Sequence, residues 1–139
     1  MKDGTSRYVD TLLGRDKEFN RINKITEKII GCAFKVSNTL GTGFLEKVYE
    51  NSLAIELSKH KLHVERQKPI DVFYEKEVVG SFFADLLVED EILIELKHAR
   101  NLDPAHKAQC LNYLRATDLR LCLLINFGKP KIEIKRISN

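Results

Sequence analysis

Two acidic residues and a lysine stand in a pattern that suits metal-assisted hydrolysis. Asp85 lies in the apolar segment 83–88, and Glu95 lies in the apolar run 92–97, which Lys97 closes. Residues two apart on a strand point to the same face of a sheet, so Glu95 and Lys97 should lie side by side while Leu96 points to the other face. Ionisable groups in such a buried run are costly unless they pair with each other or bind a metal.

Carboxylates are hard oxygen ligands, so a site between Asp85 and Glu95 would suit Mg²⁺ or Mn²⁺ better than zinc. A divalent metal can hold a phosphate oxygen and offset charge in the transition state. Lys97 is suited to orient an attacking water or to stabilise developing negative charge. The spacing is equally compatible with a partly buried Lys–Glu pair on a sheet face, so the residues alone leave both interpretations open.

Two further polar pairs could add to this site. Glu46 follows the segment Gly41-Thr42-Gly43 at the start of a predicted helix, with Tyr49 on the same face. Without other context, Glu46 is typical of a first-turn glutamate favoured by the helix dipole, and Tyr49 of a core residue. Gln109 and Tyr113 are spaced i and i+4 on another predicted helix, where the glutamine could both donate to and accept from a ligand. A surface glutamine beside a half-buried tyrosine is the simpler interpretation of that pair.

The elements that must position these residues follow from hydrophobic periodicity and from turn signals. Apolar residues at three- and four-residue steps predict a helix over 20–40, and a second helix is expected over 44–60. Asp103 as N-cap and Pro104 at the first position predict a third helix ending near 116. Strands are expected over 62–66, 69–74, 79–88, 92–97 and 121–127, with a last, edge strand over 131–137. The order predicts an α/β fold with one mixed sheet flanked by helices.

Composition restricts the class of protein. The chain has 139 residues, 43% of them hydrophobic and 31% charged, which is ordinary for a single globular domain. No apolar stretch approaches the roughly 18 residues of a membrane span, and no secretory signal is visible, so a cytoplasmic protein is expected. Three widely spaced cysteines without a CxxC pair favour reduced thiols. The net charge is +3, with a basic C-terminal third that could meet phosphates.

The segment Leu40–Tyr49, LGTGFLEKVY, resembles the signature of the bacterial and archaeal GxxExxY proteins, a family placed in the PD-(D/E)XK nuclease superfamily. The resemblance runs from about Ile25 to Ile137. It implies a restriction-endonuclease-like core over 18–139, preceded by a flexible lead over 1–17. It also implies that Asp85, Glu95 and Lys97 match the D…(D/E)xK core of the superfamily. Glu46 would then be the glutamate that the preceding helix contributes. Gln109 and Tyr113 would match the QxxxY helix of the lambda-exonuclease/RecB-like branch. In that branch the metal is held by Asp85, Glu95 and the backbone carbonyl of Leu96, with Glu46 contributing.

Two functions from different classes follow. The first is a Mg²⁺- or Mn²⁺-dependent phosphodiesterase that hydrolyses DNA, with Arg100, Lys107 and Arg115 holding the backbone and conferring little sequence preference. The second is a catalytically silent module that keeps the fold and binds nucleic acid or assembles with a partner, including a second copy of itself. Action on RNA ranks lower, because no aromatic motif of an RNA-reading module is evident.

Overall fold

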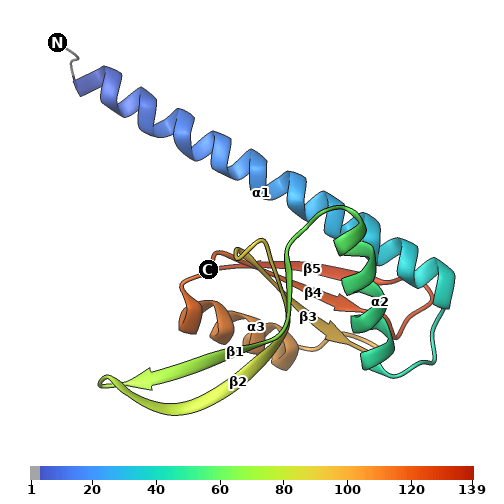
Figure 1. Ribbon diagram of the computed structural model, residues 1–139. Helices are drawn as coiled ribbons and strands as arrows, with labels where there is room; N and C mark the ends of the chain where they lie inside the picture. Colours follow the sequence, from blue (N-terminus) through green and yellow to red (C-terminus); the bar gives the residue numbers. More distant parts are fainter. Residues whose placement is uncertain (1–3) are drawn as a thin grey trace.

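Figure 1 shows the computed structural model of the chain, which describes residues 4–139, with side chains from residue 14 onward. Five strands form one sheet in the order β1-β2-β3-β4-β5. Strands β3 and β4 are parallel, and the other neighbours are antiparallel. The elements in chain order are α1 (Gly4–Leu40), α2 (Glu46–Lys59), β1 (Val64–Tyr74), β2 (Glu77–Val88), β3 (Ile92–Lys97), α3 (Pro104–Thr117), β4 (Leu121–Asn126) and β5 (Glu133–Ser138). The predicted α/β fold with a mixed sheet is confirmed.

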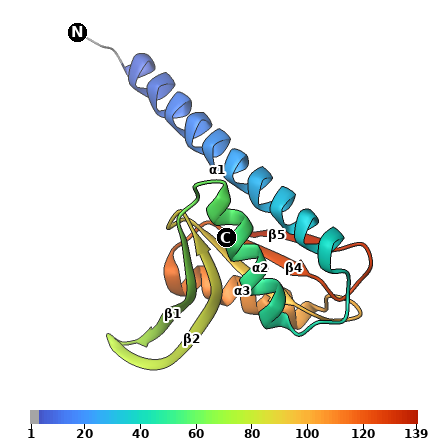
Figure 2. The same ribbon diagram turned by 45° about the vertical axis from the view of Figure 1, so that its right-hand side comes forward.

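The central strands β3 and β4 are buried on both faces, which explains their continuous apolar sequences. Alternate side chains of these two strands point into two separate hydrophobic cores, one on each face of the sheet. Ile92, Ile94 and Leu96 pack against α1 and α2, whereas Leu93 packs against α3. The turned view in Figure 2 shows α1 and α2 on one side of the sheet and α3 on the other. Glu95 and Lys97 therefore share the α3 face, as the strand period predicts, and Leu96 points the other way.

The third helix begins as predicted. The Asp103 side chain accepts hydrogen bonds from the backbone N–H groups of Ala105 and His106, and Pro104 occupies the first turn. Because the Asp103 side chain satisfies two N–H donors and proline has no N–H that needs an acceptor, the helix start is well defined. This fixes the crossover from β3 to the parallel strand β4, and with it the position of Gln109 and Tyr113 over the sheet.

Strand β1 is one continuous strand where the sequence predicts two short ones. Pro69 suggested a break, but it faces Phe83 across the β1–β2 ladder on the outermost strand of the sheet. An edge strand leaves one side of its backbone unpaired, so a residue without an N–H is tolerated. Beyond the sheet, β1 and β2 continue as a long curved hairpin, which projects from the body in Figure 1. We call its outer part, residues 69–83, the arm.

Helix α1 begins at Gly4, well before the predicted start at residue 20, and so includes most of the stretch expected to form a flexible lead. The apolar period marks only the part of the helix that packs on the sheet, where Ile22, Ile25, Ile29 and Val36 are buried. The preceding turns extend away from the body (Figure 1). Among the described residues, no helix is both long and apolar enough to cross a membrane.

Candidate active site

The candidate site lies where strands β2 and β3 separate. Their ladder pairs residues 86–88 with residues 92–94 and goes no further. Beyond it, side chains replace the backbone partners: the Asp85 N–H donates to Glu95 Oε1 at 3.1 Å, and the Leu96 N–H donates to Asp85 Oδ2 at 2.8 Å. Each carboxylate thus satisfies a backbone donor of the opposite strand. The two acids are held beside each other, as the sequence predicts. We call this opening between β2 and β3, with Asp85 and Glu95 in it, the fork.

Both carboxylates in the fork are poorly solvated. Glu95 is only 3% exposed, and burial, followed by the negative charge of Asp85, raises its pKa to about 8. Burial also raises the pKa of Asp85, against the hydrogen bond from Leu96, and the charges of Glu50 and Glu46 add to the rise. Two acids that share a dry site disfavour each other's ionisation. A cation placed between them would remove that repulsion.

A third carboxylate reaches this site from α2, and it is Glu50, which the sequence analysis missed. Glu50 is 3% exposed, one turn beyond Glu46. Its Oε2 accepts from Lys47 at 2.7 Å and from Arg66 at 3.3 Å, so its buried charge is paired. Glu46 is exposed at the first position of the helix and contributes a smaller field at Asp85 than Glu50 does. The signal for Glu50 was its place beside Tyr49 and Leu53 on the buried face of the helix.

Gln67 connects the α2 glutamate to the fork. Its Nε2 donates to Glu50 Oε1 at 2.5 Å and lies 3.4 Å from Asp85 Oδ1. Gln67 has a φ of +51°, in the left-handed region that side chains other than glycine's seldom adopt. This strained backbone conformation directs the Gln67 amide toward the carboxylates of Glu50 and Asp85, and strained residues of this kind are concentrated at functional sites. The sequence analysis placed no element over this residue, because it falls between the two short strands that were expected.

Lys97 stands at the end of β3 on the same face as Glu95, and its positive charge lowers the pKa of Glu95 against the larger effect of burial. Within residues 14–139 its ammonium group has no carboxylate within ion-pair distance. The Lys97 backbone carbonyl accepts from the Phe127 N–H at 2.9 Å, which fixes the strand end. A cationic side chain held near the acids by its backbone remains able to approach a bound anion.

Tyr49 holds the glycine loop in place, and the interpretation of Tyr49 as a core residue is confirmed. Its ring is fully buried and stacks on Phe127 with centroids 4.7 Å apart. Its hydroxyl donates to the Gly41 carbonyl at 2.6 Å and accepts from the Phe44 N–H at 3.3 Å. Gly41 and Gly43 have positive φ angles of 68° and 110°, which the loop needs to turn into α2. The loop therefore fixes where α2 begins and where its glutamates point.

The predicted pair on α3 is formed. Gln109 Nε2 donates to the Tyr113 hydroxyl at 2.9 Å, and Tyr113 is buried. Burial, followed by the negative charge of Glu95, raises the pKa of Tyr113 to about 12. The structure therefore brings this pair within electrostatic reach of the fork from the α3 side of the sheet. Gln109 and Tyr113 also border a groove of about 640 Å³ between α3 and the arm.

The three basic residues expected to hold a nucleic-acid backbone are all exposed but do not lie together. Arg115 borders the groove between α3 and the arm. Arg100 lies in the connection between β3 and α3, and Lys107 lies in the first turns of that helix.

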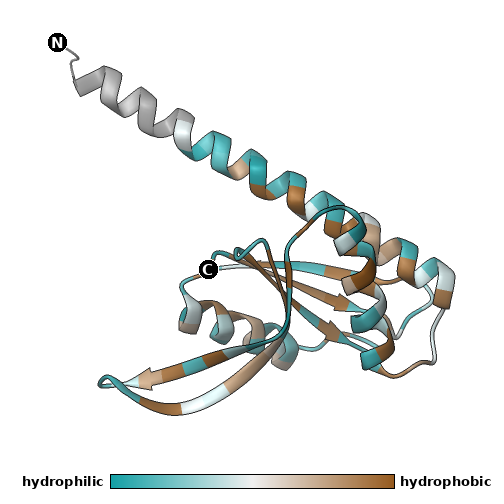
Figure 3. Cartoon of the chain, in the orientation of Figure 1, coloured by the Kyte–Doolittle hydropathy of each residue, from teal (hydrophilic) through white to brown (hydrophobic). Residues whose placement is uncertain are grey.

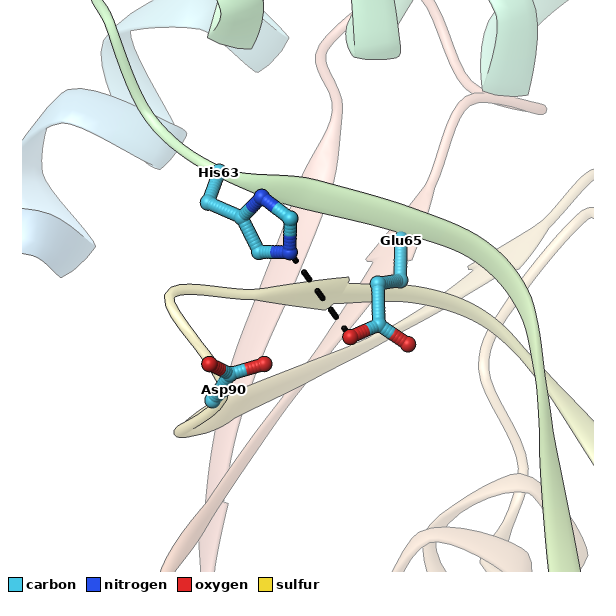
Figure 4. A group of neighbouring side chains, drawn as sticks. All are labelled: His63, Glu65 and Asp90. Carbon is cyan, nitrogen blue, oxygen red and sulfur yellow. Dashed lines mark ion pairs between the residues drawn. The ribbon is translucent and has the colours of Figure 1, made fainter.

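A second group of potential metal ligands lies elsewhere. His63, Glu65 and Asp90 each offer a ligand atom, and these atoms lie within 4.8 Å of one another (Figure 4). The group spans the start of β1 and the β2–β3 turn, at the end of β3 away from Glu95. Glu65 Oε2 is already paired with Lys68 at 3.0 Å, and this hydrogen bond lowers the pKa of Glu65. We call these three residues the outer cluster, to distinguish them from the acids of the fork.

The donors of the fork fit a hard divalent cation. Asp85 and Glu95 lie together on β2 and β3, Gln67 connects Glu50 of α2 to Asp85, and all three acids offer carboxylate oxygens, the ligand class of Mg²⁺ and Mn²⁺. The backbone of Leu96 is already anchored to Asp85, so its carbonyl is available at the same strand end. Cys32, Cys110 and Cys122 are buried, free thiols. The arrangement thus suits phosphoryl chemistry assisted by a hard cation.

Two solved structures share this architecture. The alkaline exonuclease LHK-Exo from Laribacter hongkongensis is 17% identical, with a TM-score of 0.51, and the match covers 86% of this chain and 69% of that one. The crystal structure of SSO0001 is also 17% identical, with a TM-score of 0.52, and the match covers 67% of this chain and only 49% of that one. A search of curated proteins finds no match. The sequence profile of the PD-(D/E)XK nuclease superfamily matches residues 23–137, which include every residue of the fork, and the chain therefore belongs to that superfamily.

Proposed function

We propose that the chain is a Mg²⁺- or Mn²⁺-dependent nuclease that hydrolyses DNA phosphodiester bonds, similar to the GxxExxY proteins and to the lambda-exonuclease/RecB-like branch. The observation that carries the proposal is the fork, in which the buried carboxylate of Glu95 and the half-buried carboxylate of Asp85 each accept a hydrogen bond from the backbone of the other strand. Buried acids of this kind destabilise a fold unless a ligand compensates them, and they are therefore typical of functional sites. The alkaline exonuclease with the same fold supports the assignment to nucleic acid.

Each residue then has a role set by its place. Asp85, Glu95, the Leu96 carbonyl and the α2 glutamates Glu50 and Glu46 would hold the cation. When bound, the cation supplies charge neutralisation for the phosphodiester and a lowered pKa for water. Lys97, on the Glu95 face, stabilises negative charge that develops on the phosphate oxygens. Gln109, oriented by Tyr113, offers an amide that can donate to a phosphate and accept from water.

Binding of the DNA backbone is assigned to Arg100, Lys107 and Arg115. Contacts of this type attract phosphates without reading the bases, so the affinity should fall steeply with salt and show little dependence on sequence. Such contacts position the strand, and the chemistry stays with the fork.

Cleavage of supercoiled and linear DNA with Mg²⁺ or Mn²⁺ tests the proposal. We expect the wild-type protein to cut both and to stop on chelation. Asp85→Asn and Lys97→Met should each lose at least about 100-fold in rate, because several kcal/mol of transition-state stabilisation are removed. Asp90→Asn, a matched acid-to-amide change in the outer cluster, should cut like the wild type. Equal cutting by all four proteins would contradict the proposal. Undiminished DNA binding without metal and without cleavage, unchanged in Asp85→Asn, would support the silent module instead.

The two α2 glutamates can be ranked by the same assay. Because Glu50 is buried beside Gln67 and acts more strongly on Asp85 than Glu46 does, we expect Glu50→Gln to lose more activity than Glu46→Gln. A difference of about tenfold or more, the usual size for removal of a group that supports a metal, is expected. Circular dichroism should show both variants folded, since glutamine keeps the shape of the side chain. The reverse ranking would place the exposed glutamate closer to the chemistry.

A further inference from the structure

The arm carries aromatic side chains that its own fold leaves uncovered. Phe73 is 62% exposed and Phe82 is 48% exposed, and Tyr74 and Phe83 are exposed as well. In Figure 3, hydrophobic segments lie along both strands of the arm. Large apolar side chains gathered on a projecting hairpin are unusual for a monomer surface and mark a place where something binds.

One side of the arm faces α3 and encloses a groove of about 640 Å³. Its walls include Phe73 and Phe82 from the arm and Tyr113 from the helix. The Phe82 and Tyr113 rings lie 5.9 Å apart and are tilted by 49°. The β1–β2 register shifts between Val72 and Phe73. Such a shift re-aims the following side chains, and both Val72 and Phe73 border the groove.

The groove borders the candidate active site at Gln109 and Tyr113. Tyr113 lines the groove, accepts a hydrogen bond from Gln109 and lies within the field of Glu95. Polar groups stand among the aromatic rings: Arg115 and Asn112 on the helix side and Asp71 on the arm side. A ligand seated here would therefore need flat apolar faces, hydrogen-bonding edges and a negative charge within reach of Arg115.

We infer that this groove binds an unpaired base of single-stranded DNA next to the scissile phosphate, stacked against Phe73 and Phe82. The inference rests on the proposed function for its choice of nucleic acid. A duplex hides the faces of its bases, so aromatic walls give it little to bind. An unpaired nucleotide offers a π-face to the rings, polar edges to Asn112 and Asp71, and a phosphate to Arg115. The substrate class is accordingly a single strand or the frayed end of a duplex.

Equilibrium binding without divalent metal tests the inference separately from catalysis. The probes are a single-stranded oligonucleotide carrying 2-aminopurine near its end, the same sequence with an unpaired overhang, and the blunt duplex. We expect tighter binding of the two probes with unpaired bases, and quenching of 2-aminopurine emission as it stacks. Phe73→Ala and Phe82→Leu should each weaken this binding by about fivefold or more and restore the emission, because base–aromatic stacking is sequence-tolerant and strong.

Phe19→Ala is the matched control, because Phe19 is 63% exposed on α1, away from the groove. It should bind as the wild type does. Equal affinity for blunt and unpaired probes, or no effect of Phe73→Ala, would overturn the inference. So would sedimentation that shows a wild-type dimer dissolved by Phe73→Ala, since the groove would then be a contact between copies. Stacking without any metal-dependent cleavage would refute the proposed nuclease activity and leave the groove assignment standing; cleavage without stacking would do the opposite.

Discussion

Replacing Glu95 by glutamine is expected to abolish metal-dependent cleavage and, at the same time, to make the metal-free protein more stable at alkaline pH. The glutamine can still accept from the Asp85 N–H, so the fork keeps its shape. It cannot ionise, so it neither repels Asp85 nor offers a charged ligand. Loss of a metal ligand should cost at least about 100-fold in rate. A substitution that increases stability and removes activity identifies a residue whose role is catalytic rather than structural.

The pH dependence has a definite sign. The folded-state pKa of Glu95, about 8, lies above the 4.5 of a free glutamate. Between these values the folded protein holds a proton that the unfolded chain has lost, so the free energy of unfolding falls as the pH rises from about 4.5 to about 8. Above that window, ionisation of Glu95 in the folded state lowers the free energy of unfolding by its full amount. This amount is at most about 5 kcal/mol, and about 2 kcal/mol if the site relaxes. Near pH 4.5 the folded side chain is neutral and the unfolded one is about half ionised, so little of this destabilisation is present.

Urea unfolding of the wild type and of Glu95→Gln at pH 5 and at pH 9, both with chelator, measures this difference. The variant should exceed the wild type at pH 9 by about 2–5 kcal/mol and by much less at pH 5. Glu27→Gln, which changes an exposed glutamate on α1, should shift neither curve. A Glu95→Gln protein that is less stable than the wild type at pH 9 would show that the carboxylate is a structural ion-pair partner.

Many of the secondary-structure elements could be predicted because interactions between residues close in sequence determine them. The cap at Asp103, the apolar runs of β3 and β4 and the two-residue step from Glu95 to Lys97 each depend on a few neighbouring residues. The errors have tertiary causes. Pro69 interrupts a strand only if its missing N–H has a partner to lose, and at a sheet edge it has none. Helix α1 begins at Gly4, before the apolar period of residues 20–40 that marks where the helix packs on the sheet.

The strand period and the family resemblance predicted the part of the site that lies on β2 and β3. Asp85 and Glu95 were found because acids are conspicuous in apolar strands. Glu50 was missed because its sequence context is that of a helix face packed on the core, and because its partner Arg66 comes from β1, a separate segment. The role of Gln67 depends on a left-handed backbone at a strand irregularity. No local pattern announces that conformation in a residue other than glycine.

Metal affinity is expected to depend on pH in the direction opposite to stability. A cation must displace the proton that Glu95 retains below about pH 8. The apparent affinity for Mn²⁺ should therefore approach a tenfold fall for each pH unit well below that value, so that binding at pH 6 is about 50-fold weaker than at pH 8. Titration calorimetry at pH 7 in two buffers of different ionisation enthalpy should report the release of about one proton per metal.

Variants then separate the fork from the outer cluster, the group within residues 14–139 whose potential ligand atoms all lie within 4.8 Å of one another. Glu95→Gln should lose both the tight binding and the released proton. His63→Ala removes the only nitrogen ligand of the outer cluster and should leave both unchanged. If His63→Ala abolishes binding while Glu95→Gln retains it, the cation belongs to the turn between β2 and β3, and the buried acids must be explained without it. Proton release that follows Glu95 would instead tie the cost of burying this carboxylate directly to the ligand that compensates it.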